Sequence, residues 1–97
     1  MVTYIALSNF TEQGMRNVKD STKRADVVKA VAKKFGATLT QIYWTLGKYD
    51  SVAIIEAPDD ASATAFALAI GMAGNIRTQS LRAFSKDEMD AILGKLA

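Results

Sequence analysis

The spacing of hydrophobic positions changes several times along the chain, and each spacing predicts one kind of element. Short runs rich in β-branched and aromatic residues predict strands. Such runs cover residues 2–8, 38–46, 51–57 and 76–84. Turn-forming residues separate the second run from the third, so these two runs are expected to form a hairpin.

Apolar residues three and four positions apart predict helices in the segments between the strands. Residues 21–35 carry one such stripe, and Gly36 stands where a glycine commonly ends a helix. A second stripe starts after Pro58 and runs to Gly74. A last helix is predicted near the C-terminus, because the residues from Ser85 onward have the spacing of a capping box.

The elements follow the order β-α-β-β-α-β, with one further helix at the end. This order is the ferredoxin-like pattern, and in that fold both central helices cover one face of a four-stranded antiparallel sheet. The sequence contains no linker, repeat or low-complexity tract. We therefore expect one α+β domain over residues 1–97, of the ferredoxin-like class with an extra C-terminal helix.

Both faces of the predicted sheet are apolar, although helices can cover only one of them. Alternation along the strands assigns Tyr4, Tyr43, Val52 and Ile54 to the face without helices, and Trp44 to the core. Hydrophobic residues make up 49% of the chain, which is more than so small a domain hides easily. The sequence therefore predicts a homodimer or an assembly of dimers.

The chain contains neither cysteine nor histidine. Disulfides, zinc fingers, iron–sulfur clusters, cysteine nucleophiles and Ser-His-Asp triads are thereby excluded. We predict no metal site, no cofactor and no assigned catalytic residue. Whether the chain is an enzyme stays open, and any catalysis would depend on Tyr, Asp or Arg side chains or on the substrate's own reactivity.

Basic residues are concentrated in one part of the chain. Seven of the twelve lie between positions 16 and 34: Arg16, Lys19, Lys23, Arg24, Lys29, Lys33 and Lys34. A patch for anions or nucleic acid and a solvated helix face both explain them, and we favour the helix face. RNA-recognition domains carry aromatic residues on their third strand. Residues 51–57 have none, so we predict no nucleic-acid partner.

Targeting and membrane signals are not found in the sequence. No apolar run approaches the roughly 20 residues that span a bilayer, and the first residues lack the basic region of a signal peptide. We therefore expect a cytoplasmic protein with no membrane partner.

One segment carries a specific signature, Gly47-Lys48-Tyr49-Asp50, which contains the Gly-x-Tyr-Asp motif of the GYD family. Other blocks resemble further parts of such proteins: YIALSNFT (residues 4–11), KDS (19–21), EAPDD (56–60) and RTQSLRAF (77–84). The chain resembles this family over essentially its whole length. The resemblance implies a short bacterial-type protein with a ferredoxin-like fold, similar in architecture to dimeric α/β-barrel proteins. It implies no reaction, because the family is functionally uncharacterised.

The hairpin around this signature is the first candidate site. The group consists of Tyr43, Trp44, Tyr49 and Asp50, whose aromatic rings would form walls around one carboxylate. Tyr43, Tyr49 and Asp50 are predicted to bind a small aromatic or planar ligand, with Asp50 as its anchor or as a base. A structural role explains the same residues. In that case Gly47 supplies a turn with positive φ, Tyr49 packs at the strand entrance and Asp50 caps turn amides.

Arg82, on the last strand, is the fourth candidate ligand-binding residue. It would hold a ligand, or it would form a structural ion pair with Glu56 or Asp50 across the sheet. Three further polar residues stand at strand or helix ends, where ferredoxin-like folds often open a cleft: Asn9, Arg24 and Asn75. Caps and surface polar groups explain these three equally well.

These observations lead to two hypotheses about function. The first is a homo-oligomeric small-molecule-binding domain or cofactor-free enzyme, with its pocket between the sheet and the helices. The alternative is a structural or regulatory oligomerisation module with no catalytic activity.

Overall fold

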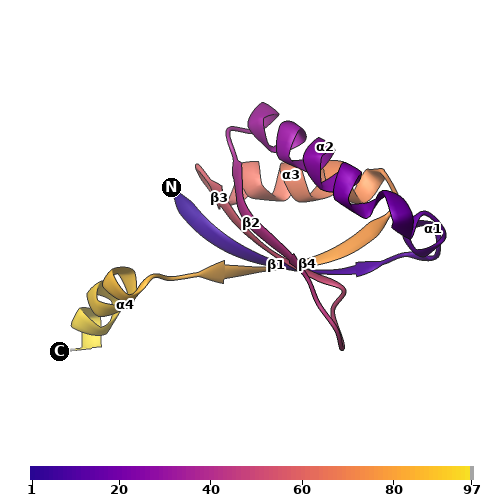
Figure 1. Ribbon diagram of the computed structural model, residues 1–97. Coiled ribbons are helices and arrows are strands. Elements are labelled where there is room, and N and C mark those ends of the chain that lie inside the picture. Colours follow the sequence, from indigo (N-terminus) through magenta and orange to yellow (C-terminus); the bar gives the residue numbers. More distant parts are fainter. Residues whose placement is uncertain (97) are drawn as a thin grey trace.

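The structure is a computed structural model that describes residues 1–96, and its elements follow the predicted order (Figure 1). The strands are β1 (Val2–Phe10), β2 (Thr38–Trp44), β3 (Ser51–Ala57) and β4 (Ile76–Ala83). The helices are α1 (Glu12–Arg16), α2 (Ser21–Lys34), α3 (Asp60–Met72) and α4 (Lys86–Leu93), with short 3-10 turns at Val18–Asp20 and Gly94–Leu96.

The four strands form one antiparallel sheet in the order β2-β3-β1-β4. This strand order, with α2 and α3 as the connections, is that of the ferredoxin-like class. Both helices lie over the same face of the sheet (Figure 1). The α+β class, the antiparallel sheet and the placement of the helices on one face are therefore confirmed.

Local signals explain where the helices begin and end. Gly36 has φ +69° just after α2, in the left-handed region that glycine adopts without steric cost. The side chain of Asp59 accepts a hydrogen bond from the Ser62 amide at 2.8 Å and caps the start of α3. Ser85 and Glu88 form the predicted capping box of α4, in which each side chain accepts a hydrogen bond from the other's backbone amide.

Small side chains dominate the core between the sheet and the helices. The buried hydrophobic residues are Tyr4, Ala6, Ala32, Ala37, Leu39, Ala53, Ala57 and Phe66. Within residues 1–96 no large side chain is completely buried. A core of alanines brings little volume under the two helices, and this leaves open space on the covered face of the sheet.

The strand register corrects the predicted position of Tyr4. Tyr4 lies opposite Ile55 on β3 and is only 7% exposed, so it faces the helices. Ile5 and Leu7 therefore face the other side of the sheet. The prediction was wrong because β1 carries apolar residues at both its odd and its even positions, so the pattern does not show which set faces the helices. A shift by one residue moves every side chain to the other face.

Trp44 is also corrected, because it is 44% exposed and lies at the rim of the core. The predicted strand was too long at this end: β2 stops at Trp44, and the Thr45 amide donates a hydrogen bond to the Asp50 carbonyl at 2.9 Å within the turn. Leu46 is fully exposed in this turn. The alternation that placed Trp44 with Leu46 therefore does not extend through the turn.

The last helix, α4, lies apart from the helical layer, beyond the end of β4 (Figure 1). Its apolar residues are open to solvent, with Met89 at 43%, Leu93 at 48% and the following Leu96 at 79% exposure. An ion pair between Arg82 and Glu88, at 3.7 Å, joins α4 to β4. Nothing within residues 1–96 thus covers a large part of the apolar face of α4.

Candidate functional site

A cavity of about 250 Å³ lies between the sheet and the helices. Apolar side chains of α2, of α3 and of the residue that follows α3 form most of its walls: Val27, Val28, Val31, Ala69, Ile70 and Ala73. A smaller hollow of about 80 Å³ adjoins it, and Val28, Ser51 and Ile70 line both spaces. The two spaces together form the candidate binding site.

The floor of this site consists of small residues that alternate along three neighbouring strands. Ala6 and Ser8 on β1 lie opposite Ala53 and Ser51 on β3, and all four are buried. The Ser8 and Thr78 hydroxyls form a hydrogen bond of 2.9 Å between β1 and β4. These side chains are too short to fill the space below α2 and α3, which is why the cavity exists.

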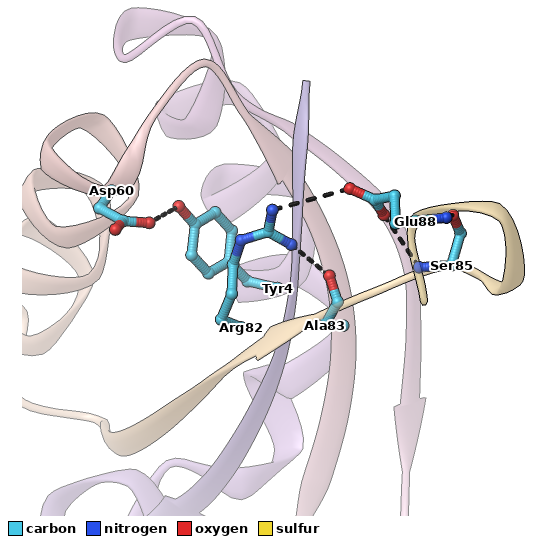
Figure 2. A network of polar contacts seen from close by, with 6 residues as sticks. All are labelled: Tyr4, Asp60, Arg82, Ala83, Ser85 and Glu88. Carbon is cyan, nitrogen blue, oxygen red and sulfur yellow. Dashed lines mark hydrogen bonds and ion pairs between the residues drawn. The ribbon is translucent and has the colours of Figure 1, made fainter. Parts of the chain in front are cut away.

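Tyr4 lines the smaller hollow, and its hydroxyl donates a hydrogen bond to the carboxylate of Asp60 at the start of α3 (Figure 2). Burial is the main cause that raises the pKa of Tyr4 to about 12, and the contact with Asp60 adds to it. Tyr4 is therefore protonated at neutral pH. Its hydroxyl acts as a hydrogen-bond donor here and not as a base.

Arg82 lies beside Tyr4 in the register of the sheet. Its guanidinium pairs with Glu88 at 3.7 Å and donates to the Ala83 carbonyl (Figure 2). It also lies 4.5 Å from the centre of the Phe84 ring, a cation–π contact. These three contacts hold the guanidinium of Arg82 at the junction of β4 and α4.

The expected ion pairs of Arg82 with Glu56 or Asp50 are not the ones that the structure forms. The partner is Glu88, because the capping box at the start of α4 folds this carboxylate back toward the end of β4. Hydrogen bonding to the Ser85 amide is the main cause that lowers the pKa of the Glu88 carboxyl.

The cavity opens near Trp44 and Arg24. Trp44, Phe10 and Ser21 line both the cavity and an outer hollow of about 290 Å³. Arg24 lines the cavity, and its guanidinium donates to the carbonyl of Asn17 at 2.7 Å. The mouth therefore combines an aromatic ring with a half-buried positive charge.

The signature residues hold the hairpin against the rest of the sheet. Gly47 has φ +104°, which a side-chain-bearing residue rarely adopts. The Tyr49 hydroxyl reaches across to Gln79 on β4 at 3.2 Å. Asp50 accepts a hydrogen bond from the Phe10 amide at 2.9 Å. These contacts tie the turn to β1 and β4. Asp50 therefore accepts from a strand amide of β1, and not from the turn amides that the structural interpretation expected.

The four predicted ligand-binding residues lie in three different places. Tyr43 is 56% exposed on the edge strand β2, opposite Val52 and on the face without helices. Tyr49 and Asp50 belong to the hairpin, and Asp50 lines the outer hollow at the cavity mouth. Arg82 lies near the other end of β1, beside Tyr4. Among the four, Asp50 is the one adjacent to the cavity.

The sequence pointed to some residues of the cavity and missed others. Arg24 and Asn75, noted as residues at element ends, both line it. The floor of Ser8 and Ser51 was missed. Trp44 belonged to the candidate group of the hairpin but was assigned to the core, whereas it lies at the cavity mouth. A signal for the floor is present, because small residues recur with a period of two on three of the strands.

The described part of the chain shows neither a metal-binding cluster nor a membrane-spanning helix. Residues 1–96 contain no group of three or more acidic side chains placed to hold a metal ion. No helix within these residues has the length and apolar character needed to cross a membrane.

Comparison with known proteins identifies the family. A curated relative, the glutamine synthetase and cystathionine beta-lyase binding protein of Thermus thermophilus, is 31% identical over 94 residues, which cover 96% of this chain and 99% of the relative. The crystal structure of TTHA0845 from Thermus thermophilus superposes with a TM-score of 0.57 at 20% identity, covering 88% of this chain and 95% of that chain; this likeness supports the fold. The GYD domain family matches residues 4–93. The chain therefore belongs to the GYD domain family.

Proposed function

We propose that this GYD chain is a homo-oligomeric binding protein that holds a small molecule in the cavity between the sheet and the helices. The observation that carries this proposal is the apolar cavity of about 250 Å³ with polar groups at its mouth and on its floor. Ligand sites in proteins combine a mostly apolar concave surface with a few polar groups that orient the ligand. The cytoplasmic location stays a prediction.

The size of the cavity supports a ligand of about one ring or a short chain. An apolar cavity of about 150 Å³ stays dry in water and binds benzene. The main space in this protein, at about 250 Å³, is larger. The adjoining hollow of about 80 Å³ extends it toward Tyr4 and Phe66.

The chemistry of the lining favours binding over catalysis. A general base near neutral pH needs a pKa close to that pH. Tyr4, with its pKa raised to about 12, does not meet this condition. The other polar groups of the sheet floor are serine and threonine hydroxyls, which have no adjacent histidine because the chain contains none. We therefore assign a binding role and no reaction.

The uncovered face of the sheet supports self-association. Ile5 pairs with Ile54 and Leu81, and Leu7 pairs with Val52, in a continuous apolar area on the face without helices. Covering such a face gains about 25 cal/mol for each Å² of apolar surface removed from water. Stacking of two sheets would give the dimeric α/β barrel that the resemblance implies, and the exposed apolar face of α4 would add to the contact.

A test of ligand binding uses 1-octanol, a neutral apolar probe, in isothermal titration calorimetry. We expect binding to the wild-type protein and its loss in Ser51→Leu, which places a larger side chain in both spaces. Ala61→Leu, on the exposed side of α3, is the control and keeps the binding. Circular dichroism confirms that both variants are folded. Equal binding by a folded Ser51→Leu protein would reject the cavity as the site.

A test of self-association uses sedimentation equilibrium at micromolar concentration. We expect a dimer or an assembly of dimers for the wild-type protein and a monomer for Ile54→Lys, because the substitution places a charge in the centre of the apolar face. Leu46→Lys, at the fully exposed hairpin tip, is the matched control and keeps the assembly. A stable wild-type monomer under these conditions would contradict the proposal.

The second candidate function is docking onto other proteins, which the curated relative favours. That relative is named for binding glutamine synthetase and cystathionine beta-lyase. In this chain α3 exposes Leu68 at 65% and Met72 at 87%, away from the open sheet face. A protein that acts by docking in this way would be a structural or regulatory module with no catalytic activity of its own. Gel filtration with those two enzymes from the same organism tests it: co-elution that Met72→Lys weakens supports docking, and separate elution with both enzymes argues against it.

A further inference from the structure

We propose that the ligand of the cavity is a monocarboxylate, with its apolar body in the cavity and its carboxylate on Arg24. This inference rests on the proposed function, because it assumes that the cavity binds a small molecule. It adds the chemical class of the ligand and the residue that recognises its charge.

The guanidinium of Arg24 is held at the mouth by neutral oxygens. It donates to the carbonyl of Asn17 at 2.7 Å, to the hydroxyl of Ser21 at 3.3 Å and to the carbonyl of Gly14 at 3.5 Å. Within residues 1–96 no carboxylate forms an ion pair with it. A half-buried arginine therefore has its position fixed while its charge is not neutralised.

Such an arrangement favours an anion. A guanidinium has more N–H donors than these contacts use, and it pairs with a carboxylate through two parallel hydrogen bonds when the geometry allows. Because the backbone carbonyls already fix the side chain, little conformational entropy is lost when an anion binds. Partial burial also reduces the screening of the charge by water.

The cavity next to Arg24 determines the rest of the ligand. Its walls are the valines of α2 and the apolar residues of α3, and its volume of about 250 Å³ fits one ring or a short chain. The acidic residue that lines the outer hollow at the mouth is Asp50. Its carboxylate accepts a hydrogen bond from the Phe10 amide at 2.9 Å. The charge that faces the cavity itself is therefore positive.

Trp44 supplies a direct readout, because it is the single tryptophan of the chain and it lies at the cavity mouth. Three probes with the same eight-carbon chain, namely octanoate, 1-octanol and octylamine, are titrated at pH 7 while Trp44 fluorescence is recorded, and calorimetry checks each affinity. We expect octanoate to bind about 10-fold or more tightly than 1-octanol, as a charge-assisted hydrogen bond provides. Octylamine is expected to bind more weakly than both.

Variants separate the head group from the cavity. Arg24→Gln is expected to lower octanoate affinity about 10-fold and to leave 1-octanol unchanged, whereas Arg24→Lys keeps part of the preference for octanoate. Arg16→Gln is the matched control, since this arginine of the same basic segment is exposed and pairs with Glu12 at 3.2 Å. Circular dichroism confirms folding, and Arg24→Lys serves as the test variant if Arg24→Gln is unfolded.

The outcomes distinguish this inference from the proposed function. Equal binding of octanoate and 1-octanol, with no effect of the Arg24 variants, would overturn the carboxylate assignment and leave the cavity as a neutral apolar site. Absence of binding by all three probes would overturn both. Octanoate binding that persists in Ser51→Leu would place the probe on an outer apolar surface, which also rejects the inference.

Discussion

The Tyr4 hydroxyl donates a hydrogen bond to the Asp60 carboxylate and thereby joins the first strand to the first turn of α3. The two residues are 56 positions apart in the sequence, so folding alone brings them together. The contact fixes one end of α3 over the sheet, beside the smaller of the two hollows.

Removing this hydrogen bond is expected to destabilise the protein. Tyr4→Phe keeps the ring in the core and deletes the donor, which costs about 1 kcal/mol of unfolding free energy. Urea denaturation at pH 7 measures the difference. An unchanged midpoint would show that the bond contributes nothing to stability.

The same residue predicts a loss of stability at alkaline pH. The folded-state pKa of Tyr4 is raised from 10.0 to about 12, so the proton is bound more tightly in the folded protein. Its contribution is fully present below pH 10 and disappears as the pH rises toward 12. The wild-type protein should therefore lose its stability advantage over Tyr4→Phe across this window. Thermal unfolding of both proteins between pH 8 and pH 12 tests this, and parallel curves would contradict it.

Gly14 is expected to tolerate no side chain. A Cβ atom at this position would lie 1.9 Å from the carbonyl oxygen of Asn75, a backbone atom that cannot rotate away. We expect Gly14→Ala to lower the unfolding free energy by about 1–3 kcal/mol, as overpacking does. Gly71→Ala is the matched control, because within residues 1–96 no atom outside the neighbouring backbone of α3 lies within 4 Å of its Cβ position. There alanine should stabilise the helix by about 0.5–1 kcal/mol.

Asp50 is expected to hold the hairpin to β1. Its side chain accepts from the Phe10 amide at 2.9 Å, and its own amide donates to the Ser8 carbonyl at 2.9 Å. Asp50→Ala removes the first contact, so the Phe10 amide should exchange with solvent faster by about 10-fold, which corresponds to about 1.4 kcal/mol. Asp50→Asn keeps an acceptor oxygen and should preserve most of the protection. Equal exchange in all three proteins would argue against this role.

The carboxyl of Glu88 is expected to titrate below its ordinary pKa of 4.5. Hydrogen bonding to the Ser85 amide is the first cause of the lowering, and Arg82 contributes less. Because the folded-state pKa is lowered, the stabilisation of α4 is present above pH 4.5 and is lost as the pH falls. An NMR titration of the side-chain carboxyl should give a lowered pKa that Arg82→Gln changes only slightly. If the Glu88 carboxyl has a pKa of 4.5 in Arg82→Gln, the ion pair with Arg82 is the main cause of the lowering.

Local patterns in the sequence explain most of the fold that was predicted. The capping residues Asp59, Ser85 and Gly36 act within a few positions of themselves, so their signals can be read without knowing the tertiary structure. The order of strands and helices follows from the same short-range periodicities. The GYD signature was likewise visible, although its contacts with Phe10 and Gln79 were not.

Two features of β1 and β2 could not be read in this way. The residues of β1 are apolar in both phases, so the side that Tyr4 faces depends on where α2 and α3 pack. Trp44 was placed in the core by alternation with Leu46, but the hairpin turn begins after Trp44. The pattern of β1 thus fitted either face of the sheet, and the pattern of β2 fitted a strand that ends at Trp44 as well as one that continues to Leu46.

The sequence by itself determined the order of elements, the helix ends, the α+β class and the exclusion of histidine- and cysteine-based chemistry, because each depends on composition or on neighbours along the chain. The tertiary structure alone decided which face of the sheet Tyr4 occupies, which partner Arg82 takes and where the cavity opens. Those features depend on side chains that are distant in sequence: the floor of small residues comes from three strands, and Arg24 reaches the mouth from α2. Local periodicity carries no information about how far a helix stands above such a floor.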